Sequence, residues 1–207
     1  MTKIKLCGLL RSCDIMAANE LMPDYIGFVF APKSKRYISP QDAKKLKAQL
    51  SPQIRAVGVF VDEKPETIAT LLEEGIIDAA QLHGSEDEAY IRQMKRLTEK
   101  PLIKAFRVNS KQDIAAAQMS MADAVLLDSG SGGRGIAFDW DLIFGMKRPY
   151  FLAGGLNAGN VKEAVERLHP YAVDVSSGIE TGGKKDKEKM AAFVQAVRSV
   201  KGDKEER

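Results

Sequence analysis

A thiol and a carboxylate are the residues of this sequence best suited to chemistry, because each follows a short apolar run. Cys7 closes the run that begins at Lys3, and Asp128 follows the run 124–127. A thiolate and a protonated carboxyl can serve as base and acid on one substrate. Because the ordinary pKa is about 8.5 for Cys and about 3.9 for Asp, these roles require a site that lowers the first and raises the second.

Other polar or small residues also follow apolar runs. Arg36, His83 and Arg107 can contact an anion, while Gly154-Gly155 and Ser176-Ser177-Gly178 are small segments of the kind that bind phosphate through backbone N–H groups. Taken singly, each has an ordinary structural explanation, such as a strand exit or a surface charge. Together they favour a site for a small phosphorylated molecule.

A glycine-rich segment comes directly after Asp128. It contains Gly132, Gly133, Arg134 and Gly135. Such a segment loses much conformational entropy when it orders. We therefore expect a mobile lid over the site, with a merely disordered connection as the alternative.

Eight short apolar runs, the expected strands, alternate with helical patterns along the whole chain. They are 3–7, 25–30, 56–60, 79–82, 102–106, 124–127, 150–153 and 172–175. Most are apolar throughout, as in parallel strands that are covered on both faces. The pattern predicts an α/β fold, a single (β/α)8 TIM barrel over residues 1–207, whose active site lies at the C-terminal strand ends. An open doubly wound sheet is the alternative, but it leaves one or two runs without a place.

Helix starts are marked by capping residues and by proline. The signals are Ser39-Pro40 with Asp42, Pro65, Ser85 with Glu88, and Ser110 with Asp113, and two further helices are expected at about 157–168 and 185–200. The segment 139–144 is expected to be short. The charged tail, about 202–207, is expected to fray.

The composition is that of an ordinary soluble domain. Hydrophobic residues make up 44% and the formal net charge is +3, which favours a buried core and gives no indication of nucleic-acid binding. No run is long enough to cross a membrane, and no signal peptide is apparent. Cys7 and Cys13 suggest neither a disulfide framework nor a metal site, and His83 and His169 do not suggest a metal cluster. We expect a cytoplasmic protein without a metal.

Several motifs, weak singly but specific in their order and spacing, carry a resemblance to a known family. They are Lys5-Leu6-Cys7-Gly8, Gly27-Phe28-Val29-Phe30 before Ser34-Lys35-Arg36-Tyr37, Gly58-Val59-Phe60, Gln81-Leu82-His83-Gly84, Leu126-Leu127-Asp128, Phe138-Asp139-Trp140, Ala153-Gly154-Gly155-Leu156-Asn157 and Asp174-Val175-Ser176-Ser177-Gly178-Ile179-Glu180. Over nearly its full length the sequence resembles phosphoribosylanthranilate isomerase of tryptophan biosynthesis. The resemblance implies an Amadori rearrangement of N-(5'-phosphoribosyl)anthranilate to 1-(2-carboxyphenylamino)-1-deoxyribulose 5-phosphate, without a cofactor or metal, in a monomer or homodimer.

The resemblance also implies roles for individual residues. Cys7 matches the general base, Asp128 the general acid, and Arg36 the residue that binds the anthranilate carboxylate. The substrate-binding positions are His83, Gly154, Gly155, Ser177 and Gly178. Three departures from the family pattern are Leu10, where Thr is usual, a cation displaced by two positions in the lid, and the loss of two polar groups there. The lid usually reads Gly-Gly-Thr-Gly-Lys-Thr or similar, where this chain has Gly132-Gly133-Arg134-Gly135-Ile136-Ala137.

Other functions remain open from the sequence. A different phosphate-binding barrel, such as a pentose-phosphate epimerase or an indole-glycerol-phosphate synthase, also suits the last two loops. The epimerase would need metal-binding His and acidic residues, and the synthase a catalytic Lys and Glu set. A barrel with reduced catalysis that binds a phosphorylated ligand for regulation is a third reading, supported by the altered lid.

Overall fold

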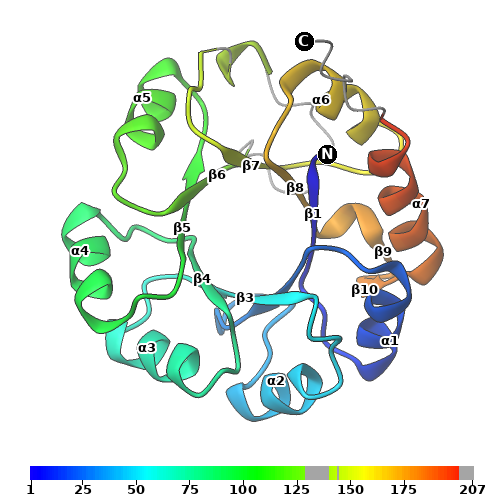
Figure 1. Cartoon of the computed structure of the whole chain (residues 1–207), viewed down its shortest axis with the longest axis horizontal. Coiled ribbons are helices and arrows are strands. Elements are labelled where there is room, and N and C mark those ends of the chain that lie inside the picture. The colour runs from blue at the N-terminus through cyan, green and yellow to red at the C-terminus, as the bar shows by residue number, and fades with distance from the viewer. Residues whose placement is uncertain (129–139, 144, 201–207) are drawn as a thin grey trace.

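The computed structural model describes residues 1–128, 140–143 and 145–200, and within them eight parallel strands close into a barrel. Each strand pairs with the next, and the last pairs with the first, so the sheet has no edge (Figure 1). The strands are β1 Lys3–Cys7, β2 Tyr25–Val29, β3 Arg55–Phe60, β4 Ala79–Leu82, β5 Leu102–Arg107, β6 Ala124–Asp128, β7 Tyr150–Ala153 and β8 Ala172–Val175. The barrel predicted from the eight apolar runs is confirmed.

Helices surround the barrel and cover its outer face (Figure 1). They are α1 Ser12–Leu21, α2 Pro40–Lys47, α3 Pro65–Glu73, α4 Glu88–Leu97, α5 Lys111–Met119, α6 Val161–Leu168 and α7 Lys187–Arg198, with short 3-10 helices η1 Trp140–Ile143 and η2 Ser177–Ile179. A small antiparallel pair, β9 Glu180–Thr181 and β10 Lys184–Lys185, lies beside α1 and α7.

The start signals in the sequence fix the starts of three helices, α2, α3 and α5. The side chains of Ser39 and Ser110 accept hydrogen bonds from the first turns of α2 and α5, as predicted. The prediction for α4 is corrected, because Asp87 caps this helix and the Ser85 hydroxyl donates to Asp62 Oδ1 instead, at 2.8 Å. The strand bounds shift slightly, since β5 and β6 include Arg107 and Asp128 as their last residues.

Packing forms two main apolar layers. Outward-facing residues such as Leu6 and Phe28 pack against the helices, whereas Val57, Leu126 and Phe151 fill the barrel interior. Because side chains alternate along a strand, inward positions of β1 and β8 hold Lys5, Cys7 and Asp174. Charged residues in an interior of this kind need partners or a function.

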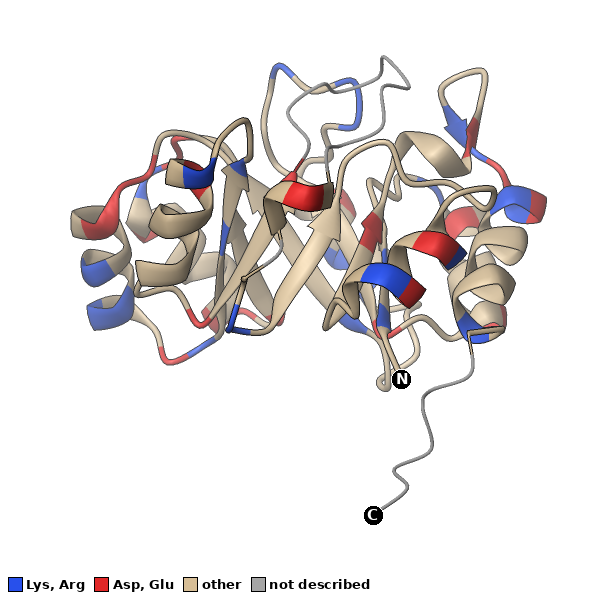
Figure 2. Cartoon of the chain, turned by 90° about the horizontal axis from the view of Figure 1, so that it is seen from above, with Lys and Arg blue, Asp and Glu red and all other residues tan. Residues whose placement is uncertain are grey.

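Charged residues of both signs are interspersed over the outer helices, without a large field of one sign (Figure 2). No helix within the described part of the chain is long and apolar enough to cross a membrane. The expected lid, with Gly132, Gly133, Arg134 and Gly135, and the expected frayed tail lie outside the described residues.

Candidate active site

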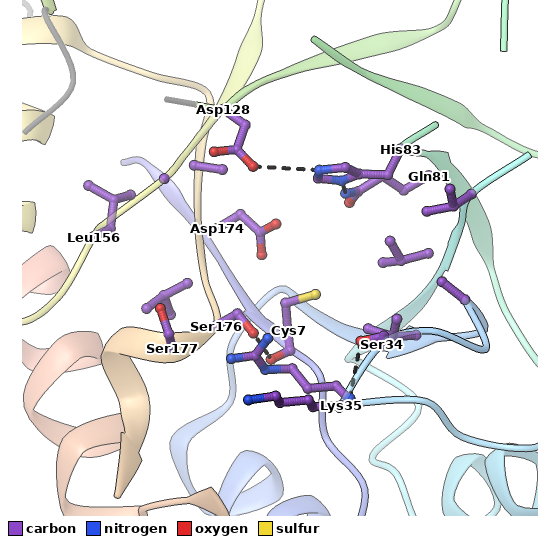
Figure 3. A pocket seen from close by; sticks show the side chains of 18 of the residues that line it. Cys7, Ser34, Lys35, Gln81, His83, Asp128, Leu156, Asp174, Ser176 and Ser177 are labelled. Atoms are coloured by element: carbon purple, nitrogen blue, oxygen red, sulfur yellow. Dashed lines mark hydrogen bonds and ion pairs between the residues drawn. The ribbon is translucent and has the colours of Figure 1, made fainter. Parts of the chain in front are cut away.

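A cavity of about 560 Å³ opens at the C-terminal ends of the strands (Figure 3). Its volume is within the range that binds small molecules. The predicted residues Cys7, Arg36, His83 and Asp128 line it. So do Gly154, Gly155 and Ser177 from the loops after β7 and β8. Residues separated by more than a hundred positions in the sequence are thus brought to one site.

One wall of the cavity is apolar. Val29, Ala31 and Val59, from β2, the loop after it and β3, form a buried cluster with Cys7, and Val61 continues this wall outward. Ser34, Lys35 and Arg36 lie in the loop that follows β2 and also line the cavity. This wall therefore suits a flat apolar group that carries a negative charge at its rim.

The opposite wall consists of backbone and small polar side chains. Gly154 and Gly155 adopt positive φ angles of 91° and 66°, a conformation that favours glycine. Among the described residues, the backbone N–H groups of Gly154, Gly155 and Ser177 have no backbone acceptor. Backbone N–H groups that lack an acceptor in the lining of a cavity suit an anion with several oxygens, such as phosphate.

Gly178 lies behind this wall and is not among the described residues that line the cavity. A Cβ at this position would come within 2.0 Å of the Leu156 carbonyl oxygen. The loop after β8 therefore packs against the loop after β7 only because residue 178 has no side chain. The contribution of Gly178 is to join the two loops.

Cys7 is buried at the end of β1, and Figure 3 shows its sulfur pointing into the cavity. Burial raises the pKa of the Cys7 thiol, and the nearby Asp174 carboxylate raises it further. Lys5 and Lys185 act in the opposite direction, but their effect is smaller than that of burial. The cations needed to stabilise a thiolate are thus present, although the net direction favours the protonated thiol.

Asp174 also lines the cavity, although the sequence predicted no role for it. Its Oδ2 accepts a hydrogen bond from Lys5 Nζ at 2.9 Å, and the Lys5 side chain is fully buried. Burial alone would lower the pKa of Lys5, but Asp174 and Cys7 outweigh it and raise that pKa, so Lys5 stays an ammonium. Asp174 Oδ1 has no hydrogen-bond partner among the described residues, and the side chain lines the cavity. The signal in the sequence was a carboxylate inside the apolar strand β8.

Asp128 and His83 lie at the end of the cavity away from Ser177 (Figure 3). His83 Nε2 is 3.5 Å from Asp128 Oδ2, and His83 Nδ1 is 2.9 Å from Gln81 Nε2. If the Gln81 amide N–H donates to Nδ1, the imidazole proton is on Nε2 and faces the carboxylate. His83 therefore contacts the predicted acid as well as the cavity.

Arg36 lines the cavity, and its guanidinium already binds Glu180, which is not among the described residues that line it. Its Nε and Nη2 donate to the two carboxylate oxygens of Glu180 at 2.6 and 2.8 Å. Arg107, by contrast, is exposed and is not among the described residues that line the cavity. Among the described residues, no group of three or more His, Cys, Asp or Glu side chains is arranged to hold a metal ion.

Comparisons with known proteins identify the family to which the sequence and the fold are similar. The sequence profile of the family described as N-(5'phosphoribosyl)anthranilate (PRA) isomerase matches residues 4–196. The N-(5'-phosphoribosyl)anthranilate isomerase of Endomicrobium trichonymphae is 47% identical over 204 residues, covering 97% of this chain and 100% of that protein.

Two solved structures are similar over 96% of this chain and 99% of their own, each at 38% identity and a TM-score of 0.84. One is a phosphoribosylanthranilate isomerase in complex with reduced 1-(o-carboxyphenylamino)-1-deoxyribulose 5-phosphate. The other is a monomer generated from the dimeric phosphoribosylanthranilate isomerase of Thermotoga maritima.

Proposed function

Because this chain belongs to the N-(5'-phosphoribosyl)anthranilate isomerase family, we propose that it converts N-(5'-phosphoribosyl)anthranilate to 1-(2-carboxyphenylamino)-1-deoxyribulose 5-phosphate in tryptophan biosynthesis. One observation carries the proposal from the geometry. A thiol and a carboxylate line the same cavity as the apolar wall, Arg36, and the segments of Gly154, Gly155 and Ser177, whose backbone N–H groups have no backbone acceptor among the described residues. This combination matches a substrate with a carboxylated aromatic ring at one end and a phosphate at the other.

The two ends of the substrate bind to the two walls. The anthranilate ring packs on Val29 and Val59, and its carboxylate accepts a charge-assisted hydrogen bond from Arg36. The phosphate lies against the N–H groups of Gly154, Gly155 and Ser177. The ribose then spans the middle of the cavity, next to Cys7 and Asp128.

The first chemical step opens the ribose ring. Protonated Asp128 donates its proton to the ring oxygen, the bond from C1 to that oxygen breaks, and the nitrogen lone pair forms a protonated Schiff base with C1. His83 is near enough to Asp128 to hold the resulting carboxylate. Because the leaving oxygen departs as a hydroxyl, the step needs an acid at this end of the cavity.

The second step moves a hydrogen within the sugar. The Cys7 thiolate removes the proton from C2, whose acidity the Schiff base has increased, and the electrons form a C1–C2 double bond. The enolamine then loses its hydroxyl proton and gains a proton at C1, which gives the ketone. C2 is oxidised and C1 reduced, so the rearrangement is redox-neutral overall.

Each turnover begins with a thiolate at Cys7 and a protonated carboxyl at Asp128, and it ends with a thiol at Cys7 and a carboxylate at Asp128. One proton must therefore return from Cys7 to Asp128 before the next substrate reacts. The raised pKa of Cys7 matches the protonated thiol at the end of a turnover. We also assign Asp174 to the substrate, because its Oδ1 can accept a hydrogen bond from a ribose hydroxyl in the cavity.

Direct assay of the purified protein with freshly prepared phosphoribosylanthranilate tests the proposal. We expect robust formation of the aminodeoxyribulose product, and a loss of about 10²-fold or more in kcat for Asp128→Asn, which keeps the shape but has no carboxyl proton to donate. Complementation of a strain that lacks this isomerase step tests the same activity in cells. If the wild-type protein bound a product analogue tightly but showed no turnover, that result would contradict the proposed isomerase activity and favour a barrel that binds a phosphorylated ligand for regulation.

The assembly and location of the protein are also part of the proposal. We expect a monomer or a homodimer, because one similar structure comes from a dimeric isomerase. We expect a reducing cytoplasm, since both cysteines among the described residues are free and a disulfide at Cys7 would remove the base. Size-exclusion chromatography with light scattering measures the oligomeric state.

A further inference from the structure

The contact between Arg36 and Glu180 joins two loops that are far apart in the sequence. Arg36 follows β2, and Glu180 begins β9 beyond β8. The two hydrogen bonds of 2.6 and 2.8 Å use Nε and Nη2 of the guanidinium against both carboxylate oxygens. This side-on, bidentate arrangement fixes the plane of the guanidinium, whereas a single contact would let it rotate.

Glu180 is itself held by a second cation. Lys185 Nζ donates to Glu180 Oε1 at 2.6 Å and to the Ser176 carbonyl oxygen at 2.9 Å, and the Lys185 side chain is only 2% exposed. Burial alone would raise the pKa of Glu180, but the hydrogen bonds from Arg36 and Lys185 outweigh it and lower that pKa. Glu180 is therefore ionised, while burial lowers the pKa of Lys185 against the opposing effect of Glu180.

The three groups differ in their access to the cavity. Arg36 lines it, whereas Glu180 and Lys185 are not among the described residues that do. The Arg36 side chain also packs closely against Gly8, because a Cβ at residue 8 would come within 2.6 Å of Arg36 Cδ. Arg36 is thus enclosed by Glu180 and Gly8, and Nη1, which has no hydrogen bond within the described residues, remains for a ligand.

We propose that Glu180, held by Lys185, is a positioning residue that orients Arg36 toward the ring carboxylate of the substrate and so sets the preference for a carboxylated aromatic group. The inference rests on the proposed function and deepens it. Glu180 does not touch the substrate and takes no part in proton transfer. Its effect comes from ordering the Arg36 side chain before the substrate arrives, which lowers the conformational entropy lost on binding.

The test compares Glu180→Gln with the wild-type protein and with Glu188→Gln, an exposed glutamate of α7 that serves as the matched control. We expect Glu180→Gln to raise KM for phosphoribosylanthranilate about tenfold and to change kcat less than about threefold. Glu188→Gln should leave both unchanged. An unchanged KM in a folded Glu180→Gln protein would overturn the proposal.

A double-mutant cycle separates positioning from a general structural role. In an Arg36→Met background, Glu180→Gln should raise KM no further, because the group that Glu180 orients is gone. A general loosening of the loop after β8 would raise KM by the same factor in both backgrounds, and that result would contradict the proposal. If Glu180→Gln folds poorly, Glu180→Asp keeps the charge for Lys185 but is one methylene too short to hold Arg36, so the same cycle applies.

Calorimetry with two product analogues distinguishes this inference from the proposed function. One probe is the reduced aminodeoxyribulose phosphate with its ring carboxylate, and the other is the same compound made from aniline. Glu180→Gln should weaken binding of the probe with the ring carboxylate and leave binding of the aniline probe unchanged. Failure of the wild-type protein to bind either probe would contradict the proposed function, whereas equal weakening of both probes would contradict the role of Glu180 alone.

Discussion

Two buried pairs of lysine and carboxylate, one inside the barrel and one outside it, show different kinds of hydrogen bonding. Outside, Lys104 of β5 donates to Glu86 Oε2 and to the Gly84 carbonyl oxygen, each at 2.8 Å. The Glu86 carboxylate also accepts the backbone N–H groups of Asp62 and Gly84 at 2.8 Å. Both carboxylate oxygens of Glu86 are therefore satisfied within the protein.

Inside the barrel, the carboxylate of the Lys5–Asp174 pair has hydrogen bonds to only one of its two oxygens among the described residues. Lys5 occupies one oxygen of Asp174, and the other has no partner among the described residues. An unpartnered buried oxygen normally costs about 1–3 kcal/mol. Because this oxygen belongs to a side chain that lines the cavity, the difference indicates a ligand site inside the barrel and a structural pair between β5 and the loop before α4.

The largest expected effect is at Cys7, next to the inner pair. Cys7→Ala removes the base and should lower kcat by about 10²–10⁴-fold, with substrate affinity mostly unchanged. Steady-state kinetics on the purified variant measures both quantities. Near-normal turnover would remove the thiol from the mechanism and leave the inner pair without a catalytic neighbour.

The outer pair should affect folding instead of turnover. Glu86→Gln leaves the Lys104 ammonium buried without a counter-charge, and we expect it to lower the free energy of unfolding by about 3–5 kcal/mol. Urea denaturation measures that loss, while kcat and KM of the folded fraction should stay at wild-type values. A change in kcat larger than the loss of folded protein would show that the outer pair also serves the site.

The fold was largely predictable because the eight strands carry continuous apolar runs, and this is a local signal. Asp174 was harder to assign, since its role depends on Lys5, a residue 169 positions away that β1 places beside it. Glu180 likewise ends the motif that begins at Asp174, but the sequence predicted no role for it, because its partner Arg36 comes from another loop. Contacts across the barrel are set by register and closure, which one sequence does not reveal.

Asp174→Asn should have an effect smaller than that at Cys7. The amide keeps the shape of the side chain but loses the charge that holds Lys5 and strengthens a bond to a ribose hydroxyl, which is worth about 1.5–3 kcal/mol. We therefore expect kcat/KM to fall about 10–100-fold. If kcat/KM falls no more than in Glu86→Gln, the contrast between the two pairs is wrong.

The pH dependence should reveal the inner thiol. Because burial raises the pKa of Cys7, the folded protein favours the thiol, so the corresponding stability is fully present below the unfolded pKa of about 8.5 and is lost as pH rises through the folded pKa. Since catalysis needs one proton shared by Cys7 and Asp128, kcat/KM should stay level until the thiol ionises and then fall about tenfold per pH unit. Urea denaturation against pH checks the loss of stability, and steady-state kinetics against pH check the fall in kcat/KM. Thiolate absorbance from Cys7 at or below pH 8 would contradict both.

The smallest effect is expected at the second thiol, which lies outside the barrel. Cys13 is exposed on α1, and its Sγ is 3.8 Å from Asp14 Oδ1, so neither burial nor a cavity constrains it. Cys13→Ser should change the free energy of unfolding by less than about 0.5 kcal/mol and leave kcat and KM unchanged. Alkylation followed by mass spectrometry should modify Cys13 first in the wild-type protein, and Cys7 only slowly and with loss of activity. Faster modification of Cys7 would mean that its thiolate is already populated at neutral pH, and the balance between burial and the two lysines around Cys7 would then favour the base before any substrate binds.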